Sequence, residues 1–124
     1  MQLDWKSLSR ATGFKINGDE ICVSLGTGRK QVVQVADAED TIHLLSFVAR
    51  AAIVAQIEDA AIQAWQRNRA VALVSFRVDQ KGRLLGESWV PKIALNEIEF
   101  QLYVRTLAVE CDRFEHQLTG RDVE

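Results

Sequence analysis

The chain has 124 residues, of which 48% are hydrophobic and 26% charged, and its formal net charge is −2. A chain of this size can bury the core of one domain, here residues 1–124, without a structural metal or a disulfide framework. The charge argues against a nucleic-acid-binding protein, because such proteins need a clustered basic face and the Lys and Arg residues here are scattered.

The sequence also bears on the compartment. The first ten residues lack the basic start and apolar run of a signal peptide. The most apolar stretch, Ile42 to Ile57, is interrupted by polar residues and is shorter than a transmembrane helix requires. Cys22 and Cys111 lie in apolar patterns, so we expect buried thiols, although a disulfide stays open. We expect a cytoplasmic protein.

The first third of the chain predicts a short helix and a β-hairpin. Leu3 to Gly13 has helical spacing, and Asp4 is placed to cap it. Asn17-Gly18 is a turn signal. Glu20–Leu25 alternates apolar and polar residues as a half-buried strand does, and Lys30–Ala36, rich in valine, is its predicted partner.

The middle of the chain is harder to interpret. Ile42 to Arg50 fits a strand buried on both faces or the start of a helix. We favour the strand, because β-branched and aromatic residues are mixed there. Gln56–Asn68 then predicts a helix with Ile57, Ala60, Ala61, Ala64 and Trp65 on its buried side.

Two more strands precede a long final helix. Val71–Val78 alternates so that Ala72, Val74, Phe76 and Val78 face the core, and Leu84–Val90 returns after a turn. The element order is therefore α-β-β-β-α-β-β-α, which predicts an α+β fold with an antiparallel sheet of about five strands and helices packed on it.

The final helix, Asn96 to Leu118, carries the strongest pattern. Its apolar residues recur at steps of three and four: Phe100, Val104, Leu107, Cys111, Phe114 and Leu118. Asn96 is placed to cap its start, and Gly120 to end it. We expect this helix to cover the sheet.

No constellation of residues points to catalysis, a metal or a cofactor. His43 and His116 lack partners at metal-ligand spacing. Cys111 and His116 project almost oppositely from the final helix, which excludes a nucleophile–base pair. Gly26 to Arg29 superficially resembles a phosphate-binding loop, but it joins two strands and predicts a hairpin turn. The sequence therefore predicts a non-enzymatic protein.

One feature of the final helix is not explained by a core. Ile98, Leu102 and Val109 project about 180° away from the apolar stripe, toward water. Ordinary exposure or contact with the first helix are possible explanations. We favour contact with another chain, either in a homodimer or with a partner, and expect Leu102→Asp to convert such a dimer to a monomer.

Part of the chain resembles a known family. The features that carry the resemblance are Asn68 at the end of the middle helix, the hairpin around Asp79–Gly82, the passage Trp89–Phe100, and the helix segment Leu107–Asp122. With them, Asn68 to Glu124 resembles the YbjN-domain family.

The resemblance implies a fold similar to type III secretion chaperones. It also implies core positions for Phe100, Leu107 and Phe114, a cap or salt-bridge role for Asp112, and no enzymatic residue. Chaperones of similar fold form dimers and hold an extended segment of another protein.

Two functional hypotheses follow. The preferred one is a chaperone-like or adaptor module, homodimeric, that binds a polypeptide through exposed apolar surface, with Trp89 and Val90 as candidate partner contacts and with no cofactor, nucleic acid or membrane involved. The alternative is a small-molecule-sensing or enzymatic domain with a pocket between sheet and helices.

Overall fold

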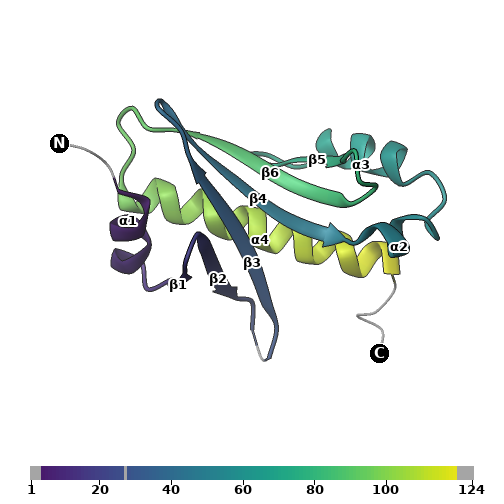
Figure 1. Cartoon of the computed structure of the whole chain (residues 1–124), viewed down its shortest axis with the longest axis horizontal. Coiled ribbons are helices and arrows are strands. Elements are labelled where there is room, and N and C mark those ends of the chain that lie inside the picture. The colour runs from purple at the N-terminus through teal and green to yellow at the C-terminus, as the bar shows by residue number, and fades with distance from the viewer. Residues whose placement is uncertain (1–3, 27, 120–124) are drawn as a thin grey trace.

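The computed structural model describes residues 4–26 and 28–119, which form a six-stranded sheet and four helices (Figure 1). In chain order the elements are α1 (Trp5–Ala11), β1 (Lys15–Asn17), β2 (Glu20–Ser24), β3 (Lys30–Asp37), β4 (Thr41–Ala49), α2 (Ala51–Val54), α3 (Ala60–Asn68), β5 (Ser75–Val78), β6 (Leu84–Pro91) and α4 (Glu97–Thr119). The predicted α+β fold is confirmed.

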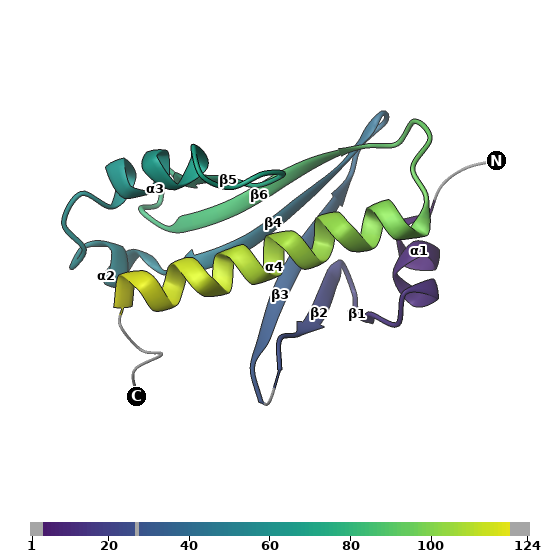
Figure 2. The ribbon, with the colours of Figure 1, turned by 180° about the vertical axis from the view of Figure 1, so that it is seen from behind.

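The sheet has the strand order β1-β2-β3-β4-β6-β5, and every neighbouring pair is antiparallel. The long helix α4 crosses one face of it (Figure 2). In the described part of the chain no helix lies over the opposite face, which is turned to the viewer in Figure 1. The choice between strand and helix at Ile42 to Arg50 is thereby settled: β4 (Thr41–Ala49) is a strand, and it lies inside the sheet between β3 and β6.

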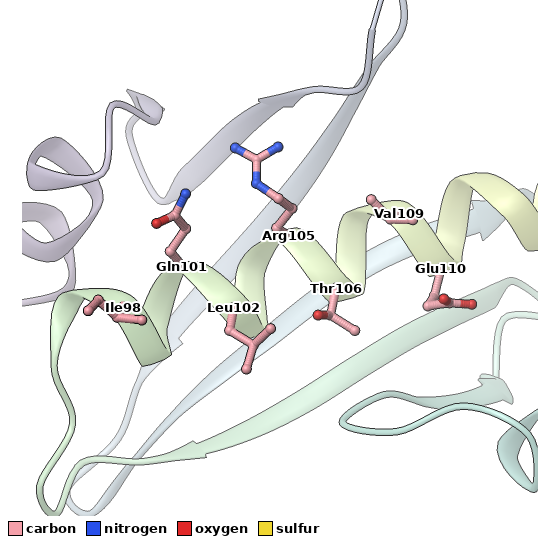
Figure 3. Close-up of a pocket in the computed structure, with 7 residues that line it drawn as sticks. All are labelled: Ile98, Gln101, Leu102, Arg105, Thr106, Val109 and Glu110. Atoms are coloured by element: carbon pink, nitrogen blue, oxygen red, sulfur yellow. The ribbon is translucent and has the colours of Figure 1, made fainter.

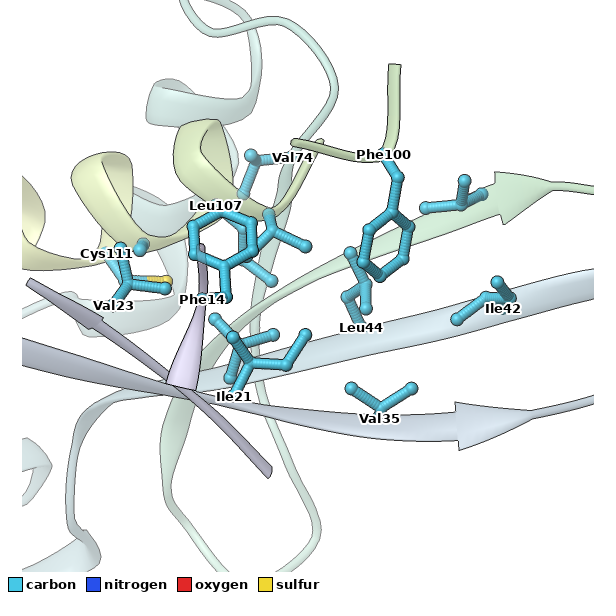
Figure 4. Close-up of a cluster of buried hydrophobic side chains, with 14 of the residues drawn as sticks. Phe14, Ile21, Val23, Val35, Ile42, Leu44, Val74, Phe100, Leu107 and Cys111 are labelled. Atoms are coloured by element: carbon cyan, nitrogen blue, oxygen red, sulfur yellow. The ribbon is translucent and has the colours of Figure 1, made fainter. Parts of the chain in front are cut away.

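The core lies between the sheet and α4 (Figure 4). Phe100, Leu107 and Phe114 of α4 are almost completely buried, as the apolar stripe predicts. They pack on the inner face of the sheet, where Ile42 and Leu44 of β4 are also inaccessible to solvent. Burial of these side chains supplies the main stabilising free energy of the domain.

The start of α4 is fixed by the predicted cap. The Asn96 side-chain oxygen accepts a hydrogen bond from the backbone N–H of Glu99 at 2.9 Å. Asp4 likewise accepts from the N–H of Lys6 at the start of α1, at 3.0 Å. Gly120, the predicted end of α4, lies outside the described residues. Among the residues that are described, no helix combines the length and the apolar character that crossing a membrane requires.

The structure differs from the predictions at three places. The turn at Asn17-Gly18 joins β2 to a further strand, β1, whose three residues are too few to show alternation. The strand predicted from Val71 begins only at Ser75, because Leu73 has a positive φ of 70° that breaks an extended chain and leaves Ala72 exposed.

The middle helix is also shorter than predicted. A four-residue helix, α2, precedes it, and Asp59 adopts the left-handed conformation immediately before α3. Only Ala60 and Ala64 of the predicted apolar side are buried. The expectation that Trp65 packs in the core is wrong, because α3 lies at the β5 edge of the sheet and turns Trp65 to solvent, with 59% of its surface exposed.

Candidate protein-binding surface

The apolar row on α4 is exposed, as its spacing predicts. Ile98 exposes 79% of its surface and Leu102 55%, while Val109 is half-buried. These side chains line a groove of about 430 Å³ together with Gln101, Arg105, Thr106 and Glu110 (Figure 3). The predicted row is thus one continuous surface on α4.

Helix α1 does not cover this groove. It packs near the start of α4 through Trp5 and Leu8, both buried, and it still leaves Ile98 and Leu102 open to solvent. Exposed leucine and isoleucine are individually common on protein surfaces. Their alignment over about three helical turns in a groove is the feature that needs an explanation.

A polar hollow of about 360 Å³ adjoins the groove. It lies between α4 and the turn that joins β2 to β3, and it is lined by Ser24, Leu25, Gly26, Arg29, Arg105, Val109, Asp112 and Arg113. The buried carboxylate of Asp112 forms an ion pair with Arg29, and its other oxygen lies 3.8 Å from Nε2 of His116. The salt-bridge role that the family resemblance implied for Asp112 is therefore observed.

The other predicted contacts, Trp89 and Val90, point in opposite directions. Val90 pairs with Ile42 across the strands and is fully buried. Side chains alternate between the two faces of the sheet along β6, and the side chain of Val90 faces α4. Its assignment to a partner surface is therefore wrong. Trp89 projects from the uncovered sheet face, is 59% exposed, and stacks on His43 with ring centroids 3.8 Å apart.

Beside this stack lies the buried carboxylate of Glu87. It receives a hydrogen bond from Nε of Arg77 at 2.6 Å and lies 2.8 Å from Nε2 of His43. Burial alone raises the pKa of Glu87, but the hydrogen bonds from Arg77 and His43 outweigh it and hold this pKa below its ordinary value. The carboxylate therefore stabilises the folded state at neutral pH.

We expect Glu87→Gln to lower the free energy of unfolding by about 1–2 kcal/mol at pH 7. A carboxyl whose pKa is lowered by folding stabilises above its unfolded pKa, and that contribution is lost as the pH falls through the native pKa. The difference between wild type and variant should therefore shrink below about pH 4. Urea unfolding at several pH values measures it. Glu58→Gln, at an exposed position, is the control, and a difference that does not shrink as the pH falls below about 4 contradicts the explanation.

The thiol of Cys111 is buried beneath α4. Burial raises the pKa of Cys111 to about 12, and its thiol lies 3.6 Å from the carbonyl oxygen of Ser46. Cys22 is only partly buried, contrary to expectation, and both cysteines are free. No group of three or more His, Cys, Asp or Glu that could hold a metal ion occurs among the described residues. The space between sheet and helix, where the alternative hypothesis placed a pocket, is filled around Leu107 by core side chains.

Two features of the surface were not found from the sequence. Ile62 and Trp65 lie three residues apart on α3 and expose more than half of their surfaces. Trp65 was predicted to lie on the buried side of this helix, and Ile62 was assigned to neither side. The pairing of Arg29 with Asp112 joins residues 83 positions apart, so no local spacing could have signalled it.

Solved structures of similar fold come from protein–protein complexes, two of them with type III secretion proteins. A chain of the heterodimeric complex ExoU–SpcU from the type III secretion system of Pseudomonas aeruginosa has a TM-score of 0.61 and 14% identity, over 92% of this chain and 97% of that one. For the ExsC–ExsE complex the TM-score is 0.62, the identity 12% and the coverage 95% and 97%. For the HopA1–SchA chaperone–effector complex the TM-score is 0.57 and the identity 10%, over 93% of this chain and 99% of that one.

These likenesses establish the fold. The chain has the fold of the type III secretion chaperones, over nearly its whole length. No protein-family model and no curated protein matches the sequence. Membership of the YbjN family accordingly remains a prediction.

Proposed function

We propose that this protein is a non-enzymatic binding module of the chaperone or adaptor type, which acts as a homodimer and holds a segment of another polypeptide. The observation that carries the proposal is the exposed apolar groove on α4, none of whose residues belongs to the hydrophobic core cluster. The fold supports it, since solved structures with this fold include a chaperone–effector complex and the Yersinia pestis secretion chaperone SycH in complex with a fragment of YscM2. The two free cysteines support action in a reducing compartment such as the cytoplasm.

We assign the α4 groove to the other polypeptide rather than to a second copy. An antiparallel pairing of two α4 helices that sets Ile98 against Val109 has its two-fold axis between Tyr103 and Val104. The two copies of Arg105 would then lie about 5 Å apart along the axis, and like charges at that spacing repel. This assignment replaces the expectation that Leu102→Asp breaks a dimer.

Helix α3 is a better candidate for the homodimer interface. Residues 60–66 of this helix contain no charged side chain, and Ile62 and Trp65 form an exposed apolar pair on it. The guanidinium of Arg69 lies 5.3 Å from the ring centroid of Trp65, at the edge of this pair. In an antiparallel two-fold pairing centred between Ile62 and Trp65, the two copies of Arg69 lie about 16 Å apart along the axis, where repulsion is largely screened, so the same patch can meet its copy. We propose that the homodimer forms through α3, which leaves the α4 groove open. Trp89, exposed on the sheet, remains a candidate second contact for the partner.

Leu102→Asp is expected to abolish capture of the polypeptide partner, because a charge in the middle of an apolar contact must be dehydrated without compensation. The tagged protein is used to capture proteins from lysate of its own cells, followed by quantitative mass spectrometry. Proteins enriched by the wild type should fall at least about tenfold with the variant.

Ile93→Asp provides the matched control, because Ile93 is 87% exposed but does not line the groove. Capture by this variant should equal that of the wild type. If Leu102→Asp and Ile93→Asp capture the same proteins in equal amounts, the α4 groove is not the binding surface.

A further inference from the structure

The apolar groove and the arginine-lined hollow are parts of one surface. Arg105 and Val109 line both of them, and Figure 3 shows these two side chains on the same edge of α4. A segment that fills the groove therefore reaches the hollow at the end nearer Val109. Its chemistry at that end is set by the side chains of the hollow.

The hollow contains more positive than negative charge. Three guanidinium groups line it, from Arg29, Arg105 and Arg113, against the single carboxylate of Asp112. Asp112 is already engaged by Arg29. Arg113 lies 3.3 Å from Glu110, which Arg67 shares at 3.4 Å.

Arg105 is the guanidinium that is left over. Within the described ranges, no carboxylate lies within ion-pair distance of it. Its guanidinium instead lies 5.5 Å from the ring centroid of Phe14, at the junction between groove and hollow. Contact with an aromatic ring holds a guanidinium in place and leaves its N–H donors free for an anion.

We propose that the hollow receives an acidic side chain of the bound polypeptide, with Arg105 as its main partner. This inference rests on the proposed function and specifies the partner. A carboxylate matches the planar donors of a guanidinium, and the adjoining apolar groove shields the pair from water. The chain as a whole carries a net charge of −2, so the hollow is a local excess of positive charge on an otherwise slightly acidic protein. This excess also fixes the orientation in which an acidic segment binds.

The geometry sets the form of the segment. Ile98 to Val109 spans about 16 Å along the helix axis, which is the length of about three helical turns. The occupant is an amphipathic segment with two or three apolar side chains on one face and an acidic residue within a turn of one end. Such a segment binds by laying its apolar face in the groove.

A phage-displayed library of random 16-residue peptides, selected on the full-length protein, tests both levels of the proposal. We expect enriched peptides to combine spaced apolar residues with a terminal Asp or Glu. The best peptide is then synthesised with its Glu and with Gln in that place, and fluorescence anisotropy gives the Kd of each. Arg105→Gln should weaken the Glu peptide about tenfold and the Gln peptide less than about twofold.

Arg50→Gln is the control, because Arg50 is exposed and lies outside the groove and the hollow. Enriched peptides that are apolar but carry no acidic residue, or equal effects of Arg105→Gln and Arg50→Gln, overturn the inference while leaving the apolar groove in place. If enriched peptides bind Leu102→Asp as well as the wild type, or if none is enriched, the proposed function itself fails.

Discussion

Gly86→Ala is expected to lower the free energy of unfolding by about 1–3 kcal/mol, the cost typical of an overpacked core. Gly86 lies on β6 beneath α4, and a Cβ atom there would lie 2.7 Å from Sγ of Cys111, 3.0 Å from Phe76 and 3.2 Å from Leu107. These neighbours are themselves buried, so α4 must move away from the sheet to make room. Denaturant unfolding followed by circular dichroism measures the change.

A second substitution provides the control. Cys111→Ala removes the sulfur that the new Cβ approaches most closely, so the double variant should recover part of the stability lost by Gly86→Ala. The single variant Cys111→Ala should itself be mildly destabilising. If Gly86→Ala is as stable as the wild type, or if Cys111→Ala adds to its effect, the close approach of α4 to β6 is not real.

Asn68→Ala is expected to destabilise the domain by about 2 kcal/mol and to promote aggregation. The Asn68 side chain donates to the carbonyl oxygen of Phe76 at 3.0 Å and accepts from its N–H at 2.6 Å. Strand β5 is the edge strand and pairs with β6 on one side only, and these backbone groups of Phe76 face the other side. Asn68 therefore takes the place of a neighbouring strand at this edge of the sheet. Without it, the edge is open to pairing with another chain.

The two bonds of Asn68 can be separated. Asn68→Asp keeps an acceptor for the N–H of Phe76 but loses the donor for its carbonyl group, so its stability should fall between those of the wild type and Asn68→Ala. Concentration-dependent light scattering reports the aggregation. Equal stability and equal scattering for wild type and Asn68→Ala would contradict the edge-protecting role.

The long helix and the central strands were predictable because their patterns are long and regular. Phe100, Leu107 and Phe114 recur over several turns, and only one face of a helix satisfies that spacing. The same stripe implied its complement, so the exposed positions of Ile98 and Leu102 followed from the sequence alone. The groove residues and the core residues thus lie on opposite faces of the same helix.

The wrong predictions concern residues whose local sequence pattern does not determine what packs against them. Trp65 and Val90 are both apolar residues in regular elements, and only the packing of α3 at the sheet edge and of α4 over β6 decides which of them is exposed. The strand β1 is too short to carry a pattern. Arg29, which lies in the hollow with Arg105, comes from a turn distant in sequence, so the acidic preference of the site required the folded chain.

The central claim is that α3 forms the homodimer while the α4 groove binds the polypeptide partner. Light scattering on three proteins tests it most directly: the wild type, Leu102→Asp and Ile62→Asp. The account predicts that the wild type and Leu102→Asp both have twice the chain mass of 13.9 kDa, whereas Ile62→Asp has the mass of one chain. Ile62 and Leu102 are matched, since they expose 54% and 55% of their surfaces on helices. If Leu102→Asp becomes the monomer and Ile62→Asp stays a dimer, the α4 groove binds a second copy and the account is wrong.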